Sequence, residues 1–198
     1  MNLPNKITVA RIFVSVFVLV MLLIPWEQLG ITFPVYTIDG NIIVDLKILI
    51  AGGLFVLGSF TDFLDGHIAR SRNIVTDFGK VMDSIADKIL VNGVLIILAK
   101  EGMIPLVVPV VIITRDIVVD SCKMISGNKG KVVAASILGK LKTIFMMVGL
   151  SLTMFYNLPF EMIGIPVAKV LVIAATILSV VSGVQYFNNS KELFINDR

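Results

Sequence analysis

The strongest constraint on this chain is a series of six apolar blocks, each close to the length of a membrane-spanning helix. They cover residues 7–24, 46–64, 81–99, 104–119, 132–155 and 165–187. A helix that crosses a bilayer needs roughly 20 mainly apolar residues. We therefore predict an all-α polytopic membrane protein with six transmembrane helices, in which residues 1–198 form a single integral membrane domain.

The composition agrees with this prediction. Hydrophobic residues make up 57% of the chain and charged residues 16%, whereas soluble domains contain about 45–50% apolar and about 25% charged residues. The single cysteine, Cys122, excludes an intrachain disulfide framework. The first block is followed by Pro25, Trp26 and Glu27 instead of a small-residue cleavage site, so we expect it to be retained.

The basic residues indicate the topology. Most of them fall at one set of block ends, and only Lys47, Lys100 and Lys169 fall at the other set. By the positive-inside rule, the first set and both termini are predicted to be cytoplasmic. The net charge of +3 does not indicate nucleic-acid binding, because the basic residues are spread between apolar blocks without interleaved aromatic residues.

Four aspartates interrupt the apolar pattern where the second and third blocks approach each other. Asp62 and Asp65 are three residues apart, and Asp83 and Asp87 are four apart, so each pair lies on one face of a helix. One carboxylate at the middle of a bilayer costs roughly 2.5–3.5 kcal/mol, and four unpaired ones would cost on the order of 10 kcal/mol. Bound cations would offset this cost.

The residue types around the aspartates favour divalent cations and a phosphate ligand. Hard oxygen ligands with His67 as the one imidazole favour Mg²⁺ or Mn²⁺ over Zn²⁺, and a pair of such cations suits phosphate chemistry. Small residues near the aspartates leave backbone exposed to a bulky ligand such as a nucleotide, and an arginine offers donors for a diphosphate. These residues are Gly66, Ala69, Gly79 and Arg70.

Two other interpretations of the aspartates stay open at this point. They can form interfacial salt bridges with Arg70, Arg72, Lys80 and Lys88, or they can form the ion site of a divalent-cation transporter. Four acids in register with two glycines and an alanine favour a functional site, because acids within membrane segments are usually functional. The fixed order of the small residues argues against a transporter.

The segment over residues 62–87 resembles the signature of the CDP-alcohol phosphatidyltransferase family. The matching positions are Asp62, Asp65, Gly66, Ala69, Arg70, Gly79, Asp83 and Asp87. The resemblance implies a homodimeric six-helix membrane fold whose active site opens to the cytoplasm, and a reaction that displaces CMP from a CDP-linked lipid or alcohol.

The resemblance also implies roles for individual residues. Asp62, Asp65 and Asp83 would bind divalent metal, and Asp87 would contribute to a second metal and act as the general base. The positions that would contact the cytidine diphosphate are Gly66, Ala69, Arg70 and Gly79.

The acceptor has to be inferred from residues outside this signature. Arg115, Lys140 and Lys142 are cations within or at the ends of apolar blocks, and together they would suit an acceptor that carries its own phosphate. Lys140 and Lys142 are two residues apart and do not share a helix face. We favour Arg115 and Lys140 for phosphate binding over Lys142, and the alternative for each lysine is snorkelling to the headgroups.

Three further segments resemble the bacterial family members that use glycerol 3-phosphate. They are Asn5, Thr8 and Arg11 near the start, Ser136, Gly139, Lys140, Lys142 and Thr143 further on, and Ser182, Gly183, Tyr186 and Phe187 near the end. This resemblance implies CDP-diacylglycerol as donor, phosphatidylglycerophosphate as product and a bacterial plasma membrane as location. The resemblance also places Asn5, Thr8 and Arg11 near the donor headgroup. Ser84 and Lys123 depart from that pattern.

Other acceptors remain possible for the same fold and donor. Phosphatidylglycerol, serine and inositol phosphate are the alternatives to glycerol 3-phosphate. The cationic residues argue against a neutral acceptor.

Overall fold

The computed structural model describes residues 3–40, 42–71, 77–128 and 136–195. Most of these residues are helical. The long helices are α1 (Leu3–Leu23), α2 (Leu46–Ser71), α3 (Asp77–Lys100), α4 (Val107–Asn128), α5 (Ile137–Met154) and α6 (Val167–Ile195). Short 3-10 helices, η1 (Trp26–Leu29) and η2 (Phe160–Ile163), follow α1 and α5.

The helices correspond to the six predicted blocks, but several are longer than their apolar part. α2 continues past residue 64, α3 begins before residue 81, and α4 extends past residue 119. Polar residues therefore continue the helices beyond the apolar core. Asp65, which lies just beyond the second block, is therefore also within a helix. The predicted start of the fifth block, residues 132–135, lies outside the described residues, and α5 begins at Ile137.

A β-hairpin occupies the connection between α1 and α2, and it departs from the all-helical prediction. Strands β1 (Val35–Ile38) and β2 (Ile42–Asp45) pair antiparallel. At the turn, Asp39 and Gly40 have positive φ angles of 52° and 73°. The backbone N–H of Asp45 donates to the Tyr156 hydroxyl at 2.9 Å, which attaches the hairpin to the end of α5. Burial raises the pKa of Tyr156, so this hydroxyl stays protonated at neutral pH.

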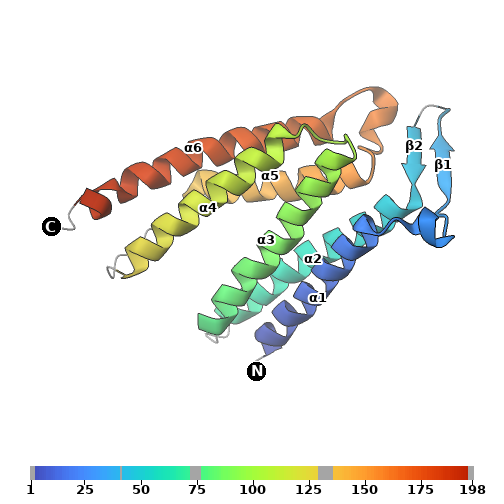
Figure 1. Cartoon of the computed structure of the whole chain (residues 1–198). Coiled ribbons are helices and arrows are strands. Elements are labelled where there is room, and N and C mark those ends of the chain that lie inside the picture. The colour runs from blue at the N-terminus through green and yellow to red at the C-terminus, as the bar shows by residue number, and fades with distance from the viewer. Residues whose placement is uncertain (1–2, 41, 72–76, 129–135, 196–198) are drawn as a thin grey trace.

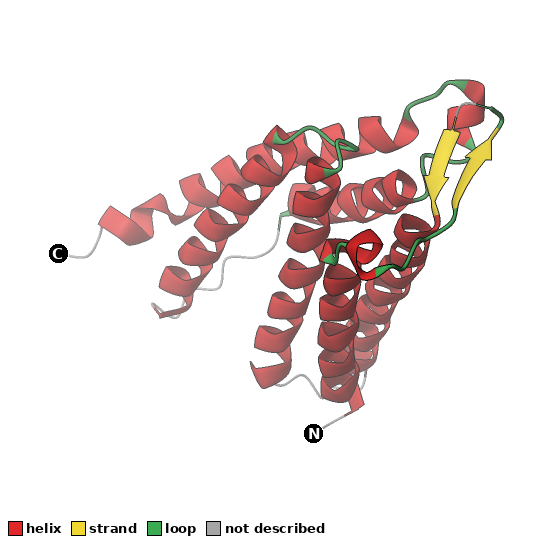
Figure 2. Ribbon diagram, turned by 45° about the vertical axis from the view of Figure 1, so that its right-hand side comes forward, coloured by secondary structure: helices red, strands yellow, loops and turns green. Residues whose placement is uncertain are grey.

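The helices form two groups that lie together near the hairpin and diverge toward the opposite end (Figures 1 and 2). In one group α1 packs against both α2 and α3, and in the other α6 packs against α4 and α5. Buried side chains such as Phe55, Leu95 and Leu150 form the core where the groups meet. Gly149 allows α5 to approach α6 closely, because a Cβ there would lie 2.9 Å from Val172 Cγ2.

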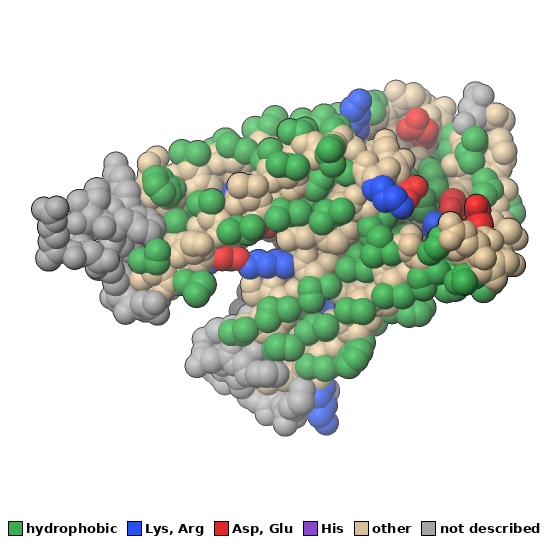
Figure 3. Space-filling view, in the orientation of Figure 1, with side chains coloured by type: hydrophobic (Ala, Val, Ile, Leu, Met, Phe, Trp, Pro, Cys, Tyr) green, Lys and Arg blue, Asp and Glu red, His purple; other side chains and the backbone are tan. Residues whose placement is uncertain are grey.

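Within the described residues, three helices are long and apolar enough to cross a membrane, at Asn5–Leu23, Ile137–Met154 and Val167–Asn189. On the face seen in Figure 3, hydrophobic side chains are spread along the helices and few charged side chains lie between them. α3 and α4 carry charged residues along their length, including Asp87 and Asp116. Asp83 and Asp87 of α3 and Arg115 and Asp116 of α4 belong to the candidate site.

Candidate active site

The guanidinium of Arg11 joins two of the signature aspartates. Arg11 lies on α1, and its Nη1 and Nη2 atoms form ion pairs with Asp62 on α2 and Asp83 on α3. Arg11 is only 3% exposed, whereas the two carboxylates are partly accessible. Two carboxylates from different helices thus converge on one positive charge.

A polar stripe on α1 brings Arg11 to this position. Asn5, Thr8 and Arg11 follow one another at intervals of three residues, and all three are buried. That spacing keeps them on one face of the helix, the face that meets α2 and α3. Ser15 extends the stripe, and its hydroxyl donates to the Arg11 carbonyl at 2.8 Å. Burial of these polar side chains distinguishes them from a simple helix end exposed to water.

Asp87 lies one helical turn after Asp83 and lines a small cavity. The cavity has a volume of about 30 Å³, and Asp116 on α4 and Lys142 on α5 also line it. This volume holds only one or two water molecules. Asp87, the candidate base, therefore shares this cavity with Lys142, one of the three cations considered for the acceptor phosphate.

Asp116 forms a second charged centre with two cations. Lys142 Nζ donates to Asp116 Oδ1 at 2.7 Å, and Arg115 Nη1 donates to the same oxygen at 3.0 Å. Lys142 is buried, so this carboxylate compensates a charge that would otherwise be costly. Asp116 therefore sets the positions of both cations.

α6 supplies the other partners of Arg115. Nε donates to the Ser179 carbonyl at 3.1 Å, and Nη2 donates to the Ser182 hydroxyl at 2.7 Å. Gly183 leaves room for the arginine stem, because a Cβ there would lie 2.9 Å from Arg115 Cγ. The Ser182–Gly183 pair singled out in the sequence is thus explained by contact with Arg115.

The Ser136 to Thr143 segment begins α5 and orients its lysines. The Ser136 side chain accepts a hydrogen bond from the Gly139 N–H at 3.1 Å and caps the helix. Lys142 points inward to Asp116, while Lys140 is exposed. The expected difference in direction between the two lysines is confirmed. However, Lys142 lines the cavity with Asp87, although the sequence favoured Lys140.

Several predicted site residues have side chains outside the described part of the structure. These are Asp65, Ala69 and Arg70 on α2. Gly66 and Gly79 are half-buried in α2 and α3. Of the cations proposed as salt-bridge partners of the signature aspartates, Lys88 instead pairs with Asp120 on α4.

The donor set suits a hard divalent cation. Among the described residues, no group of three or more His, Cys, Asp or Glu side chains is close enough to hold a metal ion. Asp62 and Asp83 already share one cationic group, and carboxylate oxygens are the ligands that Mg²⁺ and Mn²⁺ prefer. Their residue types and convergence therefore fit the predicted metal.

Sequence reasoning did not assign roles to Asp120, Ser15 or Ser179. The contact between Asp116 and Lys142 was not predicted either. For Ser15, the four-residue interval from Arg11 is a usable signal. Asp120 and Ser179 make contacts between helices that are distant in the sequence, and local spacing gives no indication of such contacts.

Comparison with known proteins identifies the family of the chain. Residues 1–181 match the family model described as CDP-alcohol phosphatidyltransferase. The CDP-diacylglycerol–glycerol-3-phosphate 3-phosphatidyltransferase of Bacillus subtilis is 39% identical over 196 residues, which is 96% of each chain. The protein of the same name from Mycoplasma genitalium is 39% identical over 156 residues, 78% of this chain and 65% of that one.

A third relative extends the similarity to another bacterial group. The protein of the same name from Rickettsia bellii is 32% identical over 194 residues, 98% of this chain and 97% of that one. The similarity thus spans both helix groups as well as the aspartate signature. The chain belongs to the CDP-alcohol phosphatidyltransferase family.

Proposed function

We propose that this protein transfers a phosphatidyl group from CDP-diacylglycerol to sn-glycerol 3-phosphate, giving phosphatidylglycerophosphate and CMP. The observation that carries the proposal is the proximity of two charged centres. Asp62 and Asp83 converge on one cation, while Asp87 shares a cavity with Lys142. The names of the bacterial relatives support the same donor and acceptor.

In the donor half of the site, aspartates would hold the divalent metal and residues beside them would bind the nucleotide. The proposed metal ligands are Asp62, Asp65, Asp83 and Asp87, and the metal is Mg²⁺ or Mn²⁺. When bound, two such cations would neutralise the diphosphate and stabilise the charge on departing CMP. The residues proposed to position the CDP group are Gly66, Ala69, Arg70, Gly79, Asn5, Thr8 and Arg11.

Asp87 is proposed as the general base. The acceptor hydroxyl oxygen forms a bond to the β-phosphorus of CDP-diacylglycerol, and the bond from that phosphorus to the CMP oxygen breaks. Asp87 takes the hydroxyl proton, and the electron pair of the broken bond leaves with CMP. The position of Asp87 on the cavity wall supports this role.

The acceptor phosphate is proposed to bind at the Asp116 centre. Lys142 would contact the phosphate directly, because it lines the cavity beside Asp87. Arg115 would hold Asp116 in place and add positive charge, since at least three of its N–H groups already bond to Asp116 and α6. Lys140, which is exposed, would attract the acceptor from the surface.

The proposed setting is a bacterial plasma membrane. All six helices would span it, with the aspartates and both termini on the cytoplasmic side. The chain would form one integral domain and assemble as a homodimer. The hydrophobic flanks and the distribution of basic residues support this arrangement.

The direct test offers the purified protein one acceptor at a time. The protein is given CDP-diacylglycerol and Mg²⁺ or Mn²⁺ with glycerol 3-phosphate, inositol phosphate, serine or phosphatidylglycerol, and both CMP and the lipid product are measured. We expect product only with glycerol 3-phosphate, and no CMP release when EDTA is present. Product from another acceptor, but not from glycerol 3-phosphate, would show that the proposed acceptor is wrong.

A further inference from the structure

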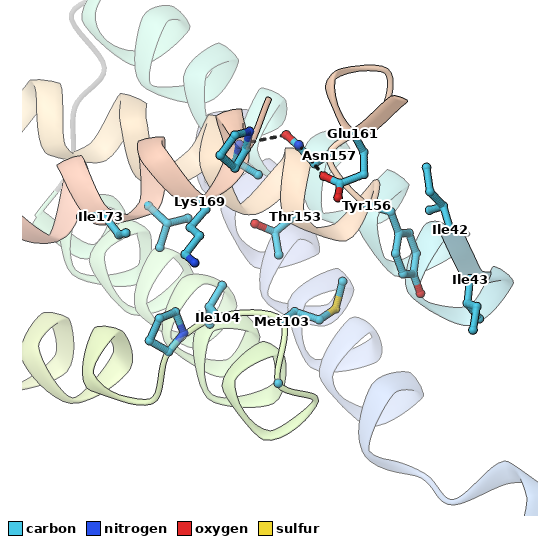
Figure 4. A pocket seen from close by; sticks show the side chains of 15 residues that line it. Ile42, Ile43, Met103, Ile104, Thr153, Tyr156, Asn157, Glu161, Lys169 and Ile173 are labelled. Atoms are coloured by element: carbon cyan, nitrogen blue, oxygen red, sulfur yellow. Dashed lines mark hydrogen bonds between the residues drawn. The ribbon is translucent and has the colours of Figure 1, made fainter. Parts of the chain in front are cut away.

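A second, larger cavity lies at the hairpin end of the molecule. Its volume is about 640 Å³, which is within the roughly 300–1,000 Å³ of ligand pockets. The α3–α4 connection, the end of α5, the start of α6 and strand β2 enclose it (Figure 4). Asp62 is 16 residues from the start of α2, or roughly 24 Å along the helix, so this cavity is separate from the proposed active site.

The cavity contains two opposite charges that do not pair with each other. Lys169 on α6 and Glu161 on η2 both line it, and within the described part of the chain neither has an oppositely charged side chain within 4.0 Å. In Figure 4 the Lys169 side chain extends from α6 toward the α3–α4 connection. Lys169 also lies in the first turn of α6, where the helix dipole favours an anion.

The carboxylate of Glu161 is held in place by a buried amide. Asn157 Nδ2 donates to Glu161 Oε2 and to the Ile165 carbonyl, each at 2.8 Å. Its Oδ1 accepts from the Ala168 N–H at 3.0 Å. These bonds use both N–H groups of the Asn157 amide, so Asn157 serves to hold Glu161 in place at the cavity. The Glu161 carboxylate is then the group that can bind a ligand.

The rest of the lining suits an acyl chain. Ile104 and Val172 form a buried apolar wall, and Ile43 and Ile173 are exposed at its margins. Because Ile43 and Ile173 are exposed, a lipid chain can enter the cavity along this apolar wall. A soluble ligand would leave this wall uncovered.

We propose that this cavity binds a phospholipid whose headgroup carries both a phosphate and a primary amine. The phosphate would meet Lys169, and the amine would donate to Glu161. One acyl chain would lie along Ile104, Val172 and Ile173. A headgroup of this type compensates both charges at once, whereas a purely anionic headgroup leaves Glu161 facing negative charge.

The test measures thermal unfolding in detergent micelles supplemented with one lipid. Dioleoyl-phosphatidylethanolamine should raise the melting temperature by roughly 5–10 °C at about 100 times its Kd. The same amounts of phosphatidylglycerol and phosphatidylcholine should give smaller rises. In Lys169→Gln and in Glu161→Gln, phosphatidylethanolamine should raise the melting temperature little more than the other two lipids do. Glutamine at position 161 keeps an oxygen that can accept the hydrogen bond from Asn157.

Lys100→Gln is the matched control, because Lys100 is exposed at the same end of the molecule but does not line the cavity. It should respond to lipid as the wild type does. Native mass spectrometry should show one more bound phosphatidylethanolamine on the wild type than on Lys169→Gln. Equal stabilisation by phosphatidylglycerol, or by soluble phosphoethanolamine, would overturn the proposal. CMP release, measured in parallel, tests the proposed function separately.

Discussion

The two charged centres between the helices use the same kinds of side chain in opposite proportions. The carboxylate centre contains Asp62, Asp83 and Asp87 with Arg11 as its described cation. The cation centre contains Arg115 and Lys142 around one carboxylate, Asp116. The first therefore has an excess of negative charge and the second an excess of positive charge.

This difference predicts what each centre binds. An excess of carboxylates is stable in an apolar setting only with added cations, and an excess of cations favours an added anion. The two centres are joined by the cavity that Asp87, Asp116 and Lys142 line. A metal-bound diphosphate and a phosphorylated alcohol can therefore be brought together by neighbouring sites of opposite charge.

The largest expected effect comes from removing the proposed base of the carboxylate centre. Asp87→Asn should lower CMP release roughly 10²–10⁴-fold, as expected for loss of general-base catalysis. The measurement is CMP formed from CDP-diacylglycerol and glycerol 3-phosphate. Asp120→Asn is the matched control, since the Asp120 side chain does not line the cavity, although its partner Lys88 does. Normal turnover by Asp87→Asn would rule out its role as base.

Removing a positive charge from the cation centre should weaken the binding of the acceptor. Lys142→Gln should raise the KM for glycerol 3-phosphate roughly 10–100-fold, because a charge-assisted hydrogen bond contributes about 1.5–3 kcal/mol. The KM for CDP-diacylglycerol should stay close to that of the wild type. Lys140→Gln should have a smaller effect, because Lys140 is exposed. A larger effect at Lys140 would reverse the assignment of the two lysines.

Arg11→Gln tests whether the carboxylate centre needs a positive charge when metal is absent. We expect the free energy of unfolding in EDTA to fall by about 1–3 kcal/mol, less than for a fully buried pair because both aspartates are partly exposed. Saturating Mg²⁺ should reduce the difference from wild type. Thermal unfolding with and without metal measures both values, and an equal loss in the two conditions would count against a shared cation site.

The smallest effect is expected at the ion pair that lies outside both centres. Asp120→Asn should change stability by at most about 1 kcal/mol, because its pairs with Lys88 and Lys123 are partly exposed. Melting temperature and KM values for both substrates provide the measurement. A change in the KM for glycerol 3-phosphate as large as that of Lys142→Gln would mean that the cation centre extends to Asp120.

The helices were predictable because their signal is local. Apolar blocks of membrane length indicated where each long helix would lie. Helix ends were less predictable, because the polar residues of α2, α3 and α4 continue the helix past its apolar part. The hairpin was missed because strands of four residues, VYTI and IIVD, are too short to show a clear two-residue period.

The family could also be recognised from the sequence. The spacing of the four aspartates resembles the family signature, and the comparisons confirm the family. The hard cations and the phosphate substrate that the aspartates indicate stay predictions. The pairing of Arg11 with Asp83, 72 residues away, was not predictable, since it depends on how α1 is rotated against α2 and α3.

The sequence by itself determined the helical segments, the family and the residue types available for chemistry, because side-chain type and helical period are local properties. Only the tertiary structure decided that Arg11 joins Asp62 and Asp83, and that Lys142 instead of Lys140 shares a cavity with Asp87. The physical reason is that packing fixes the rotation and separation of the helices. A cation and a carboxylate interact strongly only when that packing brings them within a few ångströms.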